Sequence, residues 1–153
     1  MELDFKALEN EVMGMLDKRK IIVLATCRDN IVTARSMSYV MVNNKICFQT
    51  STAFKKYEQI ANNLNVALCT DNIQIEGIAV IKNNPYEKKE FLELFKKVHR
   101  GSFDKYSHMQ SEVVIEVEPT FVTLWKYEDG NPLRDFLDRR NRKAYREYYD
   151  TSI

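Results

Sequence analysis

The 153-residue chain has almost no net charge, no long apolar run and no internal repeat. Its formal net charge of +1 gives it no overall attraction to nucleic acid or to an anionic membrane surface. No window approaches the ~20 consecutive apolar residues of a membrane-spanning helix. Low-complexity linkers are absent as well. These absences predict one soluble domain over residues 1–153 that binds neither nucleic acid nor membrane.

The three cysteines and two histidines form none of the patterns expected of a zinc site, so no metal is predicted. Cys27, Cys47 and Cys69 lie in apolar runs without CxxC spacing, which predicts buried free thiols. An odd cysteine count without a secretory leader is typical of a reducing compartment, so we expect a cytoplasmic protein. His99 and His108 flank the segment RGSFDKYS, where lone histidines are usually surface residues; a proton donor or haem ligand is the alternative.

Short β-branched runs separated by tight polar turns predict antiparallel hairpins. The turn-forming pairs are Asp29-Asn30, Asn43-Asn44 and Asp71-Asn72. Gly77 marks a bulge or a close backbone approach. Helical spacing predicts amphipathic helices over residues 4–18, 53–63 and from Pro85 to Gly101, the second capped by Ser51 or Thr52.

Two further strands are expected on either side of Pro119, followed by a polar tail over 128–153 that we predict to be helical. Strands joined by tight turns, with helices inserted singly, favour a mainly antiparallel barrel over a doubly wound parallel sheet.

Small hydroxyl groups and basic side chains gather where the third expected strand meets the second helix. Thr50 and Ser51 end that strand, Lys55 and Lys56 lie at the helix start, and Arg35 is on the neighbouring strand. A helix N-terminus, hydroxyl donors and fixed cations together suit a phosphate monoester dianion. The alternative from spacing alone is an ordinary helix cap followed by two solvated lysines.

The segment from Ile21 to Ala79 resembles the FMN-binding split barrel of the pyridoxamine-phosphate-oxidase-like family. The resemblance lies in the order and spacing of ATCRDNIVTARSMSYVMVNNKICFQTSTAFKKYEQIANNLNVALC: a strand with an Arg, a strand ending in Thr and Ser, a basic helix start and the phrase ANNLNVAL. It implies a mainly β fold, an antiparallel split β-barrel of Greek-key type with flanking helices. It also implies FMN as the cofactor and a homodimer with two flavin sites at the interface.

The resemblance assigns residues to each part of the flavin. Those implied to hold the phosphate are Arg35, Lys55 and Lys56. Those whose backbone is implied to lie along the isoalloxazine ring are Ser36, Met37 and Ser38. Those implied to bond to the ring edge or ribityl chain are Thr50 and Ser51.

Three later residues are implied to lie near the flavin. Asn72 or Gln74 would reach it from the partner subunit, and both stay open because a one-residue slip in strand register reverses the side chains that face the site. Trp125 would lie near the flavin, with a core or dimer-interface tryptophan as the alternative.

The end of the chain departs from the family. Pyridoxamine-phosphate oxidases hold the substrate phosphate with an Arg and a His near the C-terminus, whereas this chain ends AYREYYDTSI without a histidine after His108. We therefore expect an FMN-dependent oxidoreductase of the flavin-reductase or nitro-compound-reductase type instead of a pyridoxamine-phosphate oxidase. The flavin would carry electrons between a small-molecule donor, with NADH and NADPH as candidates, and a small acceptor, so no catalytic side chain is assigned. The alternative is a non-catalytic protein that binds flavin or haem in the same pocket.

Overall fold

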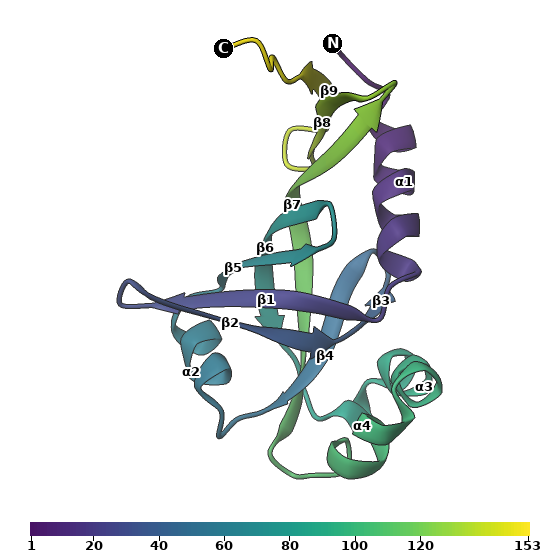
Figure 1. The fold of residues 1–153 in the computed structure, drawn as a ribbon. Helices are drawn as coiled ribbons and strands as arrows, with labels where there is room; N and C mark the ends of the chain where they lie inside the picture. Colours follow the sequence, from purple (N-terminus) through teal and green to yellow (C-terminus); the bar gives the residue numbers. More distant parts are fainter.

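The computed structural model describes residues 1–153, in which nine antiparallel strands form one curled sheet flanked by helices (Figure 1). The predicted mainly β, antiparallel split barrel with flanking helices is confirmed. The strands are β1 (Ile21–Arg28), β2 (Ile31–Ser38), β3 (Val40–Val42), β4 (Lys45–Ser51), β5 (Asn65–Thr70), β6 (Ile73–Ile81), β7 (Glu112–Glu128), β8 (Asn131–Asp138) and β9 (Lys143–Tyr148). The helices are α1 (Phe5–Asp17), α2 (Lys55–Asn62), the 3-10 helix η1 (Pro85–Glu87), α3 (Lys89–Val98) and α4 (Arg100–Tyr106).

The long strand β7 organises the sheet. β6 pairs with one edge of β7, while β4 and then β8 share the other edge. The main path of the sheet runs β2-β1-β5-β6-β7-β4-β3, so β2 has a partner on one side only. The hairpin of β8 and β9 extends the far end of β7, close to both chain termini (Figure 1).

The predicted hairpin turns are confirmed by their backbone angles. Asp29 and Asn30 have φ of 52° and 63°, and Asn43 and Asn44 have φ of 51° and 60°. Asp71, at the third turn, has φ of 49°. Asn and Asp tolerate the left-handed region better than other non-glycine residues, so these turns form from local sequence alone.

Gly77 lies at the expected bulge. The β6–β7 register shifts between Glu76 and Gly77. A Cβ atom at Gly77 would lie 2.5 Å from Val117 Cγ1 and 3.1 Å from the Glu118 carbonyl oxygen. Both predicted features, the bulge and the close approach, therefore occur together.

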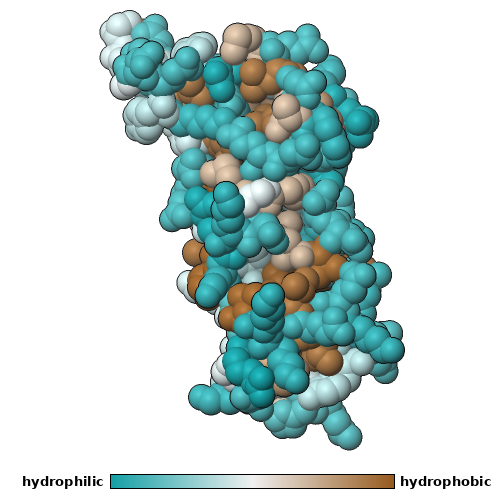
Figure 2. Space-filling view, turned by 90° about the vertical axis from the view of Figure 1, so that its right-hand side faces the viewer, coloured by the Kyte–Doolittle hydropathy of each residue, from teal (hydrophilic) through white to brown (hydrophobic).

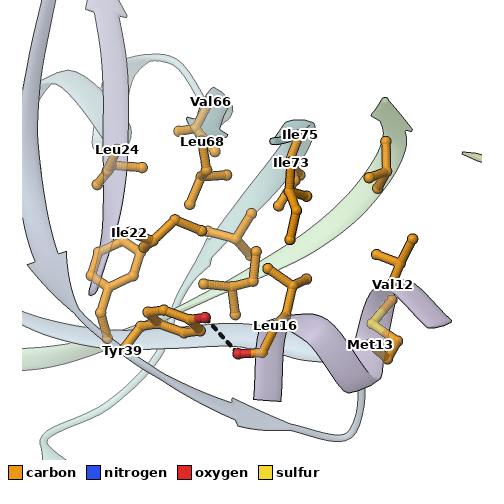
Figure 3. Packing of buried hydrophobic residues seen from close by; sticks show 14 of the residues in the cluster. Val12, Met13, Leu16, Ile22, Leu24, Tyr39, Val66, Leu68, Ile73 and Ile75 are labelled. Atoms are coloured by element: carbon orange, nitrogen blue, oxygen red, sulfur yellow. Dashed lines mark hydrogen bonds between the residues drawn. The ribbon is translucent and has the colours of Figure 1, made fainter. Parts of the chain in front are cut away.

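The core lies between α1 and the concave side of the sheet (Figure 3). Val12 and Leu16 of α1 are fully buried against apolar side chains of β1, β5 and β6. The Tyr39 hydroxyl donates a hydrogen bond of 2.5 Å to the Leu16 carbonyl oxygen at the end of that helix. Burial raises the pKa of Tyr39 to about 12. This contact fixes the chain between β2 and β3.

The predicted helical tail is wrong, because most of residues 128–153 belongs to β8 and β9. In β8 the inward-facing positions are Leu133, Asp135 and Leu137. An aspartate in the middle of the inward face breaks the apolar alternation that would reveal a strand. The expected break at Pro119 is wrong as well, since β7 continues through this residue.

Two helix boundaries also differ from the prediction. α2 begins at Lys55, and its N-cap is Phe54, without a side-chain hydrogen bond; the Ser51 hydroxyl instead accepts one from the Ala53 N–H. Pro85 begins η1, and Gly101 lies inside α4 instead of closing the helix before it.

The thiol environments differ from one another. Cys47 is buried, Cys27 is half-buried and Cys69 is exposed, so the prediction of three buried thiols is correct only for Cys47. Burial raises the pKa of Cys47 to about 12.

The face that carries α1 and the α3–α4 pair is mostly hydrophilic, with hydrophobic patches showing between the hydrophilic side chains (Figure 2). None of the helices combines the length and apolar character needed to cross a bilayer.

Candidate functional site

A cavity of about 300 Å³ lies where β2, β4, the start of α2, the α3–α4 pair and the start of β7 meet. Five residues predicted to bind the flavin line it, namely Ser36, Met37, Ser38, Thr50 and Lys56. The other lining residues are Gln49, Phe54, Phe95, Ser102, Tyr106 and Glu112. Strands and helices that are far apart in the sequence therefore bring the predicted group to one place.

Thr50 carries an unpaired polar atom in this cavity. The residue is 3% exposed, and its Oγ1 has no hydrogen-bond partner. Its backbone is held by the β4–β7 ladder opposite Val113. Because buried hydroxyl groups in proteins are nearly always hydrogen-bonded, this atom calls for a water molecule or a polar ligand group beside it.

Arg35 of β2 does not line the cavity, but it lies close enough to Lys56 to affect its charge, and a partly buried network orients it. Its Nη1 donates to Thr26 Oγ1 at 2.8 Å and to the Leu24 carbonyl oxygen at 3.2 Å, and its Nη2 donates to Thr33. The Thr26 and Thr33 hydroxyls each donate to Gln59 Oε1 at 2.6 Å. Gln59 lies in the middle of α2, so this network joins the helix to the β1–β2 hairpin and holds the Arg35 guanidinium in place.

Lys55 and Lys56 are not equivalent. Lys56 is half-buried and lines the cavity, whereas Lys55 is exposed and does not. Burial lowers the pKa of Lys56, the nearby Arg35 lowers it further, and Glu112 acts in the opposite direction. Burial also lowers the pKa of Arg35. Two partly desolvated cations therefore lie next to each other without a carboxylate in contact with either.

The start of α2 adds to this positive environment. No side chain caps the helix at Phe54. The first backbone N–H groups of a helix have no partner within it and carry partial positive charge. An anion near Lys56 would therefore meet a cation and a helix N-terminus together.

The far wall of the cavity comes from the α3–α4 pair. The Ser107 hydroxyl donates a buried hydrogen bond of 2.8 Å to Gln49 Oε1, and His99 Nε2 lies 2.8 Å from the Tyr39 carbonyl oxygen. These contacts dock the two helices on β3 and β4. They place Phe95 and Tyr106 at the cavity.

Glu112, the first residue of β7, completes this wall. Sequence reasoning missed the whole wall because helical spacing identifies a helix but not which strands it covers. The polar run MQSE, which ends at Glu112, gave no sign that its one carboxyl group is buried.

The remaining predicted residues lie outside this cavity. The Ser51 hydroxyl donates to Ser111 Oγ at 3.1 Å. Asn72 donates from Nδ2 to the Trp125 carbonyl oxygen at 2.8 Å, so its amide is used within the subunit. Gln74 is exposed and lines a separate groove of about 390 Å³ over β1, β5 and β6.

The Trp125 ring lies at the β8–β9 end of the molecule. It packs edge-on against Tyr149, and the Arg134 guanidinium lies 5.3 Å from its centroid. Trp125 and Asn72 are thus neighbours of each other within one subunit.

Comparison with known proteins places this arrangement in a family. Residues 8–126 match the family model described as pyridoxamine 5'-phosphate oxidase. No curated protein matches the chain by sequence.

Three solved structures share the fold at low identity. ChuZ of Campylobacter jejuni has a TM-score of 0.72 at 15% identity, over 92% of this chain and 63% of that one. A pyridoxamine 5'-phosphate oxidase-related, FMN-binding protein of Nostoc punctiforme has a TM-score of 0.63 at 13% identity, over 95% of this chain and 94% of that one. HutZ of Vibrio cholerae, a heme storage protein, has a TM-score of 0.61 at 14% identity, over 73% of this chain and 89% of that one. The match over residues 8–126 is the stronger evidence, and by it the chain belongs to the pyridoxamine 5'-phosphate oxidase family.

Proposed function

We propose that the protein binds FMN in the cavity at β2, β4 and α2 and works as an FMN-dependent oxidoreductase on a small molecule. The observation that carries the proposal is the unpaired, buried Thr50 Oγ1 in a cavity that also holds the Lys56 ammonium. A related protein of the same fold, from Nostoc punctiforme, is described as FMN-binding.

The donor set fits a phosphate monoester. Arg35 and Lys56 would supply charge-assisted hydrogen bonds to the phosphate, and the uncapped start of α2 would add backbone donors. Lys55, which is exposed and outside the cavity, would contribute only long-range attraction. The network through Thr26, Thr33 and Gln59 would hold the Arg35 guanidinium in place before the ligand arrives.

The flavin ring fits the edge of β2. Because β2 pairs only with β1, the other side of its backbone has N–H and C=O groups without a strand partner. Ser36, Met37 and Ser38 would bond to the polar edge of the ring through this backbone. Thr50 Oγ1 would complete its hydrogen bonding with the ring edge or the ribityl chain. Bound FMN supplies hydride or electron transfer, so the protein itself would bind and orient.

A homodimer would complete the site. Ile21, Val23, Ile31 and Val32 on β1 and β2 are exposed apolar residues, and Val23 and Gln74 line the groove over β1, β5 and β6. A second copy on this face would cover the apolar side chains and the open edge of β2. Gln74, whose amide is exposed, is then a better cross-subunit ligand than Asn72, whose amide is bonded to Trp125.

Haem binding is the alternative, because HutZ has the same fold and is described as a heme storage protein. Of the two histidines, His99 is within hydrogen-bond distance of the Tyr39 carbonyl oxygen, so His108, which is exposed, would be the free ligand. The absorbance spectrum of the purified protein separates the two cofactors.

Titration of the apoprotein with FMN and riboflavin tests the proposal directly. We expect FMN to bind at least tenfold more tightly, since only FMN carries the phosphate. Equal affinities would rule out the phosphate site. Anaerobic bleaching of bound FMN by NADH or NADPH would then support turnover, and pyridoxamine phosphate with oxygen should give no pyridoxal phosphate at an ordinary enzymatic rate. If the bound FMN exchanges electrons with no donor or acceptor tested, a non-catalytic binding protein is favoured.

A further inference from the structure

Glu112 is a buried carboxyl group in the cavity that the proposed flavin site does not use. It is 4% exposed and is the first residue of β7, paired in register with Ser51 of β4. Its N–H donates to the Met109 carbonyl oxygen at 3.1 Å, and its own carbonyl oxygen accepts from Asn84 Nδ2 at 3.3 Å. The backbone is therefore fixed from both sides, and the side chain lines the cavity.

The Glu112 carboxylate accepts no hydrogen bond, and no cationic nitrogen lies within 4.0 Å of it. Titratable groups that share the cavity with it are Lys56 from α2 and Tyr106 from α4. Arg35 of β2 is close to Lys56, while β2 and β4 otherwise contribute hydroxyl groups and the Gln49 amide. Burial raises the pKa of Glu112, and the positive charge of Lys56 opposes that rise. The positive charge of Lys56 therefore favours the ionised form of Glu112.

An anion bound at Lys56 would remove that support. The ligand's negative charge would offset the positive charge of Lys56, and the ligand would displace water from the cavity. Both changes disfavour an ionised carboxyl group. An acceptor oxygen of the ligand beside Glu112 would act in the same direction, because only the protonated carboxyl group can donate a hydrogen bond.

We propose that the pocket binds the FMN phosphate together with a proton, which Glu112 takes from solvent. The inference rests on the proposed phosphate site at Arg35 and Lys56. The ionised form of Glu112 opposes the anion and the protonated form does not, so affinity for FMN falls as the pH rises. Glu112 would then be a positioning residue that links ligand binding to pH. Its protonated form would favour anionic ligands that also carry a hydrogen-bond acceptor next to it.

The test compares the pH dependence of FMN binding in the wild type and in Glu112→Gln, which keeps the shape and removes the proton. Uptake of one proton makes the dissociation constant rise up to tenfold per pH unit. For each pH unit, we expect the dissociation constant of FMN to rise at least three times more in the wild type than in Glu112→Gln. Ionisation of the FMN phosphate contributes to both proteins and cancels in the comparison. Because Glu112 raises the pKa of Lys56, the two proteins are compared at and below neutral pH, where the lysine is protonated in both. Glu93→Gln, an exposed position on α3, is the matched control and should behave as the wild type.

Calorimetry in two buffers of different ionisation enthalpy counts the protons on the wild type alone, which keeps the test decisive if Glu112→Gln does not fold. Infrared difference spectra should gain a protonated carboxyl band on FMN binding. If FMN binds tightly but without proton uptake and with the same pH dependence in all three proteins, the inference fails while the FMN site stands. If FMN does not bind to the wild type, the proposed function fails and the inference with it.

Discussion

Asp135 and Arg146 form a two-point ion pair across β8 and β9. Arg146 Nε donates to Asp135 Oδ1 at 2.7 Å, and Arg146 Nη2 donates to Oδ2 at 2.9 Å. Lys126 Nζ lies 2.8 Å from the same carboxylate and 2.7 Å from that of Glu11 in α1. Asp135 is 1% exposed. The pair therefore joins the β8–β9 hairpin to β7 and α1 through one buried carboxylate.

Replacing Asp135 with asparagine should destabilise the fold. The substitution leaves Lys126 and Arg146 without their shared counter-charge in a partly buried place, which costs about 2–4 kcal/mol of unfolding free energy. Urea denaturation measures the loss. Asp104→Asn is the control, because its pair with Arg100 is exposed and should contribute less than about 0.5 kcal/mol. Equal effects of the two substitutions would contradict a structural role for the buried pair.

The same carboxylate should make stability depend on pH. Burial alone would raise the pKa of Asp135, but hydrogen bonds from Arg146 and Lys126 outweigh it and lower the pKa. A carboxyl group with a lower pKa in the folded state stabilises the fold above its unfolded pKa of about 4 and loses that contribution as the pH falls. The stability gap between wild type and Asp135→Asn should therefore narrow below pH ~4. A gap that stays constant down to pH ~2 would be inconsistent with this pKa.

The sequence predicted those parts of the fold that depend on neighbouring residues. The turns at Asp29-Asn30 and Asn43-Asn44 follow from local backbone preferences, and α1 follows from its apolar spacing. The β8–β9 hairpin was missed because Asp135 occupies an inward-facing position, and its burial depends on cations from two other elements.

The same reasoning separates the two parts of the candidate site. Thr50 and Lys56 lie within seven residues and were found together. Glu112 was not found, because it becomes part of the cavity only through long-range pairing of β7 with β4.

Gly77→Ala should test the close contact at the bulge. The new Cβ would lie 2.5 Å from Val117 Cγ1 in the buried β6–β7 pair, which requires local rearrangement and costs about 1–3 kcal/mol. Gly101→Ala is the matched control, because nothing lies within 4 Å of its Cβ position and the residue is helical. That control should be neutral or more stable by about 0.5–1 kcal/mol. Thermal unfolding of both variants measures the difference, and similar shifts would argue against the tight approach.

The two lysines at the start of α2 should contribute unequally to FMN binding. Lys56→Ala removes an ammonium group from the cavity and should weaken FMN by about 10–100-fold, the range of a charged hydrogen bond. Lys55→Ala removes only an exposed charge and should weaken FMN by less than about threefold. Fluorescence titrations with FMN and with riboflavin measure both effects. Riboflavin affinity should change little in either variant. A larger loss of FMN affinity in Lys55→Ala than in Lys56→Ala would show that the phosphate binds outside the cavity.

Val23→Glu should separate the proposed dimer into monomers. Val23 lies on β1, is 36% exposed and lines the groove that also contains Gln74. A carboxylate there would be buried without a partner in the interface of both copies, which costs more than the apolar contact it replaces. Leu94→Glu is the control, since Leu94 is similarly exposed but belongs to α3. Sedimentation should show a dimer for the wild type and for Leu94→Glu, and a monomer for Val23→Glu. Because the partner would supply Gln74, the monomer should also bind FMN more weakly. A wild type that sediments as a monomer with FMN bound would refute both the dimer and the cross-subunit role of Gln74.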